Sequence, residues 1–254
     1  MHRFSLAERV AVITGGAGGL GSAIAAGFAE AGAAVVVADL TVEPCESVAA
    51  KIVESGGNAV GYALDVTIDD AVETAFADIA RKFGRIDILV NSAGIARRAP
   101  ALEQSRSDWE QVMAVNTTGV FLSCRAAARQ MMKNGGGSMV NMASIMGLSG
   151  GGLYPNISYQ TSKGAVVNMT RSLALEWAAD SIRVNAIAPT WVRTDFIKAI
   201  VNDPNLLTRV EQMIPLGRLA EPDDIVGAAL FLASPASAMV TGHILAVDGG
   251  FLAQ

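Results

Sequence analysis

Short apolar runs alternate with longer amphipathic segments along almost the whole 254-residue chain. In the first unit, RVAVIT predicts a strand, GSAIAAGFAEAG predicts a helix that ends at Gly32, and AAVVVADL predicts a second strand. These runs are apolar throughout, which is typical of strands that are buried on both faces of a parallel sheet. Two layers of helices are needed to cover both faces. The pattern therefore predicts an α/β, Rossmann-type doubly wound parallel sheet with helices on both faces.

The alternation continues to the C-terminus without an internal repeat, a low-complexity tract or a linker. Further strands are expected at Val60–Asp65, Ile86–Asn91, Ser138–Ser144, Ile182–Pro189 and within His243–Gly250. Helices are expected at about Glu43–Ser55, Asp69–Phe83, Ser107–Met132, Ser158–Ala178 and Pro222–Ala233. We therefore expect a single domain over residues 1–254, with its function at the carboxyl ends of the strands.

Composition narrows the possible partners. The formal net charge is −5, and no group of Lys and Arg exceeds the ARR at Ala96–Arg98, which argues against a nucleic-acid partner. No uninterrupted apolar run is long enough to cross a bilayer, so a soluble protein with no membrane partner is expected. Cys45 and Cys124 are too few for a disulfide framework and show no metal-ligand spacing, so no metal is expected. The N-terminal stretch lacks a cleavage pattern, which favours a cytoplasmic location.

A glycine-rich stretch, ITGGAGGLG at residues 13–21, joins the first predicted strand to the first predicted helix. Two spacings fit it, G-x-G-x-x-G and T-G-x-x-x-G-x-G, which use Gly16, Gly18 and Gly21 or Thr14, Gly15, Gly19 and Gly21. Either spacing puts bare backbone at a helix start, where free N–H groups and the positive helix end favour a pyrophosphate. The alternative is an ordinary flexible turn, since such turns are common in α/β proteins.

Asp39 ends the second predicted strand, at the distance from the glycine loop expected of a carboxylate that binds an adenosine ribose. Such a carboxylate accepts hydrogen bonds from the ribose hydroxyls and repels a 2′-phosphate. Leu40 and Thr41 supply no cation to offset that repulsion. The sequence therefore favours NAD over NADP. The alternative is that Asp39 is a helix cap or a turn residue.

Four polar residues fit proton chemistry. Tyr159 and Lys163 in SYQTSK are four residues apart, on one face of a predicted helix. A phenol has a reference pKa of about 10, which a neighbouring ammonium and an oxidised nicotinamide would lower. Ser144 follows a predicted strand and would emerge at the edge that carries the glycine loop. The structural alternatives are a surface Tyr–Lys stack and a serine cap. Asn116 either kinks an apolar helix or positions a water, and its spacing leaves both open.

The order and spacing of these motifs resemble those of the short-chain dehydrogenases/reductases over nearly the whole chain. The matching segments are TGGAGGLG, DV at 65–66, NSAG at 91–94, Asn116, Ser144 and YQTSK. The resemblance implies the Gly15, Gly19, Gly21 spacing and a catalytic tetrad of Asn116, Ser144, Tyr159 and Lys163. It implies a dinucleotide site made of Gly15, Gly19, Leu20, Gly21, Asp39, Leu40, Asp65, Val66, Asn91, Ala93, Gly94, Tyr159, Lys163, Pro189, Val192 and Thr194.

The resemblance also implies the reaction, a reversible hydride transfer between NAD and an alcohol/carbonyl pair. Tyr159 would exchange the hydroxyl proton, Lys163 would favour its phenolate, and Ser144 would stabilise the oxyanion. Asn116 would keep a water near Lys163. The family's common Pro-Gly pair is Pro189-Thr190 here, so a stiffer segment opens the expected substrate loop at about 190–215.

The substrate is expected to be a secondary alcohol or its ketone. Residues 145–158 and the loop after Pro189 would wall the pocket, with substrate contacts from Ser144, Met146, Asn156, Tyr159 and Trp191. LALEWAADSIRVNAIAP and VTGHILAVDGG resemble polyol and sugar-acid dehydrogenases, such as galactitol or gluconate dehydrogenases. One alternative is a 3-oxoacyl-carrier-protein reductase, against which stand Asp39 and the lack of a basic patch. Another is a non-catalytic dinucleotide-sensing regulator, which would not need the tetrad.

Assembly follows from two long predicted helices. GVFLSCRAAARQMM and GAVVNMTRSLALEWA carry apolar residues on more than one face. One face would meet the sheet and another would meet a neighbouring subunit. Because the family is usually tetrameric, a homotetramer is expected, and the alternative is a monomer in which these helices lie in the core.

Overall fold

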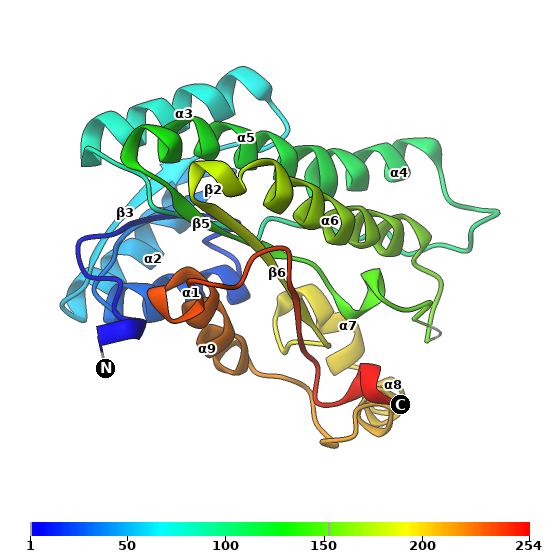
Figure 1. Ribbon diagram of the computed structural model, residues 1–254. Coiled ribbons are helices and arrows are strands. Elements are labelled where there is room, and N and C mark those ends of the chain that lie inside the picture. Colours follow the sequence, from blue (N-terminus) through cyan, green and yellow to red (C-terminus); the bar gives the residue numbers. More distant parts are fainter. Residues whose placement is uncertain (1, 152) are drawn as a thin grey trace.

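A computed structural model describes residues 2–151 and 153–254, which form a layered α/β structure around one parallel sheet (Figure 1). Its seven strands run in the order β3-β2-β1-β4-β5-β6-β7. The strands are β1 (Val10–Thr14), β2 (Ala34–Asp39), β3 (Asn58–Ala63), β4 (Ile88–Asn91), β5 (Gly137–Met142), β6 (Ile182–Pro189) and β7 (Ile244–Val247). Each neighbouring pair is parallel. The predicted fold class is therefore confirmed.

Helices cover both faces of the sheet. Figure 1 shows α3, α4, α5 and α6 on one side and α1, α2 and α9 on the other. Their bounds are α1 (Gly19–Glu30), α2 (Val42–Glu54), α3 (Asp69–Phe83), α4 (Arg106–Met113), α5 (Gly119–Met131), α6 (Ile157–Glu176) and α9 (Pro222–Ala233). Successive side chains of a strand enter different cores, since Val36 packs under the α3–α5 layer while Val35 and Val37 pack under the α1–α9 layer. This explains why the central strands carry apolar residues at successive positions.

The strand order reverses beside β1. β2 and β3 lie on one side of β1, and β4 to β7 lie on the other. The helices that follow β1 and β4 therefore leave the sheet in opposite directions, which opens a crevice at the carboxyl ends of these strands. Thr14 and Asn91 are paired at that edge. Ligands of open α/β sheets bind at such a reversal.

Several predicted boundaries need correction. The strand predicted at Ile86–Asn91 begins at Ile88, and the helix predicted to end at Gly32 ends at Glu30. The predicted strand Val60–Asp65 lies two residues earlier, at Asn58–Ala63. The single helix predicted at Ser107–Met132 is interrupted by a π-helical turn, Ala114–Thr118, between α4 and α5. A π-turn adds one residue and so shifts the apolar pattern that follows it, but this segment carries apolar residues on more than one face, which hides the shift. Ser144 follows β5 by two residues and does not end it.

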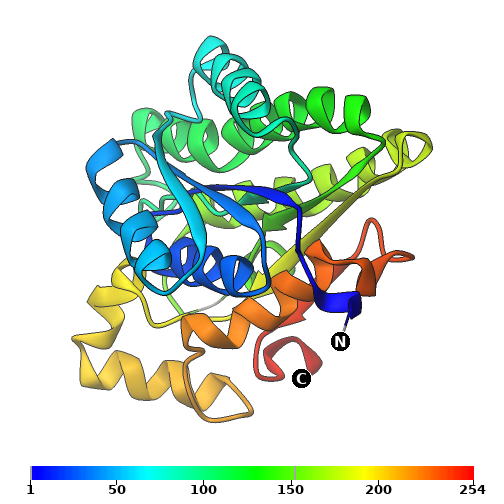
Figure 2. The same cartoon turned by 90° about the vertical axis from the view of Figure 1, so that its left-hand side faces the viewer.

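The segment from Asp195 to Gly217 forms a separate lobe below the sheet, drawn in yellow and orange in Figure 2. It contains a short 3₁₀ turn (Asp195–Ile197), α7 (Lys198–Val201) and α8 (Pro204–Met213). Buried Ile197, Ile200 and Val210 pack with Met146 and Trp191 in a small core of their own. The predicted substrate loop is therefore largely helical.

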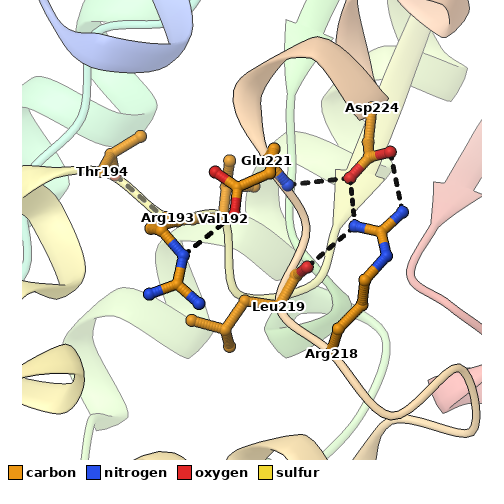
Figure 3. A network of polar contacts seen from close by, with 7 residues as sticks. All are labelled: Val192, Arg193, Thr194, Arg218, Leu219, Glu221 and Asp224. Atoms are coloured by element: carbon orange, nitrogen blue, oxygen red, sulfur yellow. Dashed lines mark hydrogen bonds and ion pairs between the residues drawn. The ribbon is translucent and has the colours of Figure 1, made fainter.

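Polar contacts tie the two ends of this lobe together (Figure 3). The Arg193 backbone donates to the carbonyl of Ala220 at 2.8 Å, and its Nε donates to Glu221 at 2.9 Å. The Arg218 guanidinium donates to both carboxylate oxygens of Asp224, at 2.6 and 3.0 Å. Because both ends are fixed to the start of α9, the lobe leaves and re-enters the fold at one place, beside the end of β6.

Within the part of the chain that the structure describes, none of the helices has the length and apolar composition needed to cross a bilayer.

Candidate active site

The turn between β1 and α1 has almost no room for side chains. Gly15 has a φ of +66°, and a Cβ there would lie 2.5 Å from the backbone nitrogen of Ala93. A Cβ at Gly21 would overlap the carbonyl oxygen of Gly15, and one at Gly19 would lie 2.9 Å from the Thr194 side chain. At each of these three positions, a different close neighbour leaves no room for a side chain, so glycine is required.

The same turn leaves hydrogen-bond donors available. α1 begins at Gly19, and its N-cap residue, Gly18, contributes no side-chain hydrogen bond. The first N–H groups of a helix lack partners within the helix, and the helix dipole makes that end positive. The loop therefore fits the pyrophosphate of a dinucleotide, which can approach the bare backbone and accept from these donors.

Asp39 ends β2 directly beside this loop. Its Oδ2 accepts from the backbone N–H of Ala17 at 3.2 Å, and its Oδ1 accepts from that of Leu40 at 2.9 Å. The α2 N-cap is Thr41, so Asp39 does not cap that helix. The carboxylate therefore braces the glycine loop and also lines the cavity beside it.

One cavity runs along the carboxyl edge of the sheet, from the glycine loop to the segment after β6. The predicted site residues that line it are Gly15, Gly19, Leu20, Gly21, Asp39, Leu40, Asp65, Val66, Ala93, Gly94, Ser144, Met146, Asn156, Tyr159, Lys163, Pro189, Trp191, Val192 and Thr194. Residues from seven separate segments of the sequence thus meet at one site. Asn91 and Asn116 are the predicted site residues that do not line it.

Ser144, Tyr159 and Lys163 meet on one wall of the cavity. Tyr159 and Lys163 lie one turn apart on α6, and Lys163 Nζ is 5.6 Å from the centre of the Tyr159 ring. Lys163 is buried, and its Nζ donates to the carbonyl of Met142 at 2.6 Å. The Ser144 hydroxyl oxygen accepts from the backbone N–H of Met146 at 3.1 Å. The burial of Lys163 is not that of a surface Tyr–Lys stack. Ser144 does cap the short 3₁₀ turn Ile145–Gly147 through this bond, as the structural alternative expected, and it also lines the cavity.

Burial shifts the pKa values of the two ionisable groups in opposite directions. It raises the pKa of Tyr159 to about 12, although the Ser144 hydroxyl contact and the charge of Arg98 act to lower it. It lowers the pKa of Lys163 to about 8. At neutral pH the phenol therefore holds its proton and most Lys163 side chains are charged. Deprotonating Tyr159 requires more stabilisation than its surroundings in the protein alone supply.

Asn116 lies in the π-helical turn and is fully buried. Its Oδ1 accepts from the Ile95 N–H at 2.8 Å, and its Nδ2 donates to the Ile95 carbonyl at 2.9 Å and to Ser162 Oγ at 3.0 Å. A Cβ at Gly94 would lie 3.5 Å from Asn116 Oδ1 and 3.7 Å from Lys163 Nζ. Asn116 therefore joins the segment after β4 to α6 and also faces the Lys163 ammonium across Gly94.

Asn91 has an internal role that its place in the NSAG motif does not reveal. Its side chain is buried, and its Nδ2 donates to Asn141 Oδ1 at 2.9 Å and to Cys124 Sγ at 3.2 Å. It therefore joins β4 to β5 and α5 beneath the cavity. The expectation that the Asn91 side chain lines the cleft is corrected.

Two aromatic residues and an arginine form the far wall. The Arg98 guanidinium carbon lies 4.5 Å from the centre of the Tyr154 ring, and the Tyr154 hydroxyl accepts from Trp191 Nε1 at 3.1 Å. All three line the cavity. The sequence shows Arg98 only as part of the ARR group at Ala96–Arg98. Its contact with Tyr154 could not be predicted, because Tyr154 lies far away in the sequence.

Comparisons with known proteins agree with this geometry. A family model described as enoyl-(acyl carrier protein) reductase matches residues 15–252. A D-threitol dehydrogenase of Mycolicibacterium smegmatis is 43% identical over 98% of this chain and 94% of that protein. A galactitol 2-dehydrogenase (L-tagatose-forming) of Cereibacter sphaeroides is 42% identical over 98% and 96%. The crystal structure of a gluconate 5-dehydrogenase from Burkholderia cenocepacia, in complex with NADP and tartrate, has a TM-score of 0.96 and 37% identity, covering 100% and 98% of the chains. The chain belongs to the short-chain dehydrogenase/reductase family of oxidoreductases.

We expect the Asn116→Ala substitution to lower the free energy of unfolding by about 1–3 kcal/mol, because it removes the partner of the buried Ser162 hydroxyl and of the part-buried backbone groups of Ile95. Urea unfolding measures the change. The matched control is Thr117→Ala in the same π-turn, where the hydroxyl makes only a long contact of 3.9 Å to Met113 sulfur. Equal stability of the Asn116→Ala variant and the parent protein would contradict this role.

Proposed function

We propose that this protein is an NAD-dependent oxidoreductase that interconverts a secondary alcohol and a ketone on a polyol, sugar or sugar acid. The observation that carries the proposal is the meeting of Ser144, Tyr159 and Lys163 on one wall of a cavity whose other end is the glycine loop and Asp39. A bound nicotinamide dinucleotide supplies the hydride acceptor or donor.

In this proposal, the side chains handle the proton and the developing charge. Tyr159 takes the hydroxyl proton during oxidation and returns it during reduction. The charged Lys163 favours the phenolate, and the Ser144 hydroxyl donates to the oxygen on which negative charge develops. Asn116 Oδ1 and Lys163 Nζ both face Gly94, so a water bound between them would extend the proton route away from Tyr159.

The choice of NAD rests on Asp39. Its carboxylate faces the cavity beside the glycine loop, where it would accept from ribose hydroxyls and repel a 2′-phosphate. Among the described lining residues, the two cations are Arg98 and Lys163, and both belong to the Tyr159 end. The related Burkholderia structure contains NADP, so the choice of NAD for this chain rests on Asp39 and not on that relative.

The substrate class is supported by relatives and by the far wall. The relatives named above act on threitol, galactitol and gluconate. Arg98 adds a positive charge at the substrate end of the cavity, which suits the carboxylate of a sugar acid. The segment at 190–215 would cover the bound substrate as a lid.

Absorbance at the NADH band, with threitol, galactitol, gluconate and an acetoacetyl thioester as substrates, tests the reaction class. We expect NAD reduction with at least one polyol or sugar acid. Faster turnover of the acetoacetyl thioester with NADPH would favour a carrier-protein reductase. Binding of the dinucleotide without turnover of any alcohol or carbonyl would favour a dinucleotide-sensing regulator.

We expect Asp39→Ala to reduce the ratio of kcat/KM with NAD to kcat/KM with NADP roughly ten-fold, which corresponds to about 1.4 kcal/mol. The substitution removes both the ribose acceptor and the repulsion of a 2′-phosphate. The matched control is Asp78→Ala, whose ion pair with Arg81 lies on the surface of α3. A parent enzyme that prefers NADP, or an unchanged ratio in the variant, would contradict the assignment.

We further propose a homotetramer of one-domain subunits (residues 1–254) in the cytoplasm. Phe121 on α5 and Leu175 on α6 are exposed apolar residues that a neighbouring subunit would cover, with Leu175 83% exposed in the single chain. Cys45 and Cys124 are buried free thiols, which suits a reducing compartment. Light scattering at about four times the 26.3 kDa chain mass is expected, and a single-chain mass would contradict the assembly.

A further inference from the structure

Two polar atoms at the substrate end of the cavity have no hydrogen-bond partner among the described residues. They are Asn156 Oδ1 and Thr190 Oγ1. Asn156 is 5% exposed and Thr190 is 8% exposed, and both line the cavity together with Ser144 and Tyr159. Buried polar side chains in native proteins are almost always paired, so each exception calls for an explanation.

Asn156 occupies a position at which the side chain usually accepts a hydrogen bond from the helix backbone. It is the N-cap residue of α6, and asparagine at this position commonly accepts from an N–H of the first turn. Here it makes no such bond. Because it lies three residues before Tyr159, its side chain is held close to the predicted proton-transfer group by the start of the same helix.

The backbone of Thr190 is fixed at the end of the sheet. It follows the last residue of β6, and its backbone N–H donates to the carbonyl of Val247 at 3.2 Å. The next residue, Trp191, is 4% exposed and donates to Tyr154. The backbone of Thr190 is therefore fixed beside the cavity, and its buried hydroxyl has no partner among the described residues.

We propose that Asn156 and Thr190 form a hydroxyl-binding pair that selects substrates with a second hydroxyl beside the reacting carbon. In this proposal, a substrate hydroxyl donates to Asn156 Oδ1 and accepts from the Thr190 hydroxyl. A substrate without that hydroxyl leaves both buried groups unpaired, which is how a site built for a hydroxyl rejects its deoxy analogue. The inference rests on the proposed alcohol–ketone reaction and makes its substrate class more specific.

The test compares Thr190→Val, which removes the hydroxyl at nearly constant volume, with Thr190→Ser, which keeps it. The substrates are threitol and butane-1,3-diol, whose secondary alcohol has no hydroxyl on either neighbouring carbon; if gluconate is the faster substrate, its 4,6-dideoxy analogue replaces the diol. We expect Thr190→Val to lower kcat/KM for the full substrate roughly ten-fold and to leave the deoxy analogue within about two-fold. Thr190→Ser and the exposed control Thr74→Val should behave like the parent enzyme.

Asn156→Ala should give the same pattern as Thr190→Val. An equal loss on both substrates would overturn the proposal and make Thr190 a wall residue. A raised KM for NAD with an unchanged ratio of the two substrates would also overturn it and assign the hydroxyl to the dinucleotide. Parent enzyme that turns over no alcohol at all would defeat the proposed function itself, whereas turnover with an unchanged substrate ratio defeats only the hydroxyl-binding pair.

Discussion

The site depends on the attachment of a buried lysine to the edge of the sheet. Lys163 is 4% exposed, and its ammonium donates to the carbonyl of Met142, the last residue of β5, at 2.6 Å. A buried ammonium is costly without such a partner. This contact fixes α6 to the carboxyl edge and thereby sets the position of Tyr159 one turn earlier. Because parallel strands end at one edge, the glycine loop after β1 and Asp39 after β2 lie along the same cavity.

Burial shifts the pKa values of Tyr159 and Lys163 away from their ordinary values. A phenol whose pKa is raised to about 12 keeps its proton at neutral pH, and an amine whose pKa is lowered to about 8 is close to releasing its own. Positive charge placed near the phenol lowers the pKa of Tyr159 strongly in such a site, because little water screens the charge. Arg98 already acts in this direction from the far wall. Tyr159 is therefore a buried acid whose ionisation would respond strongly to the positively charged ring of an oxidised nicotinamide beside it.

The sequence predicts the fold well because the central strands are buried on both faces and are therefore rich in apolar side chains. It also predicts that Ser144, Tyr159 and Lys163 share a wall, since strand ends and helical spacing determine that. It does not predict the π-turn around Asn116, because apolar residues on more than one face of this segment hide the shift that one extra residue causes. Nor does it predict the inward direction of Asn91, which depends on Asn141 fifty residues later. The Arg98–Tyr154 contact and the unpaired atoms of Asn156 and Thr190 depend on loop geometry that local sequence does not encode.

Replacing Tyr159 with Phe tests the central claim most directly, because it removes one hydroxyl and retains the ring that packs against Phe196 at 5.7 Å. Steady-state rates on the best substrate, together with a dinucleotide-binding titration, separate chemistry from binding. The account predicts that kcat falls roughly 10²–10⁴-fold while the dinucleotide still binds. A variant that oxidises the alcohol as fast as the parent enzyme would contradict the account.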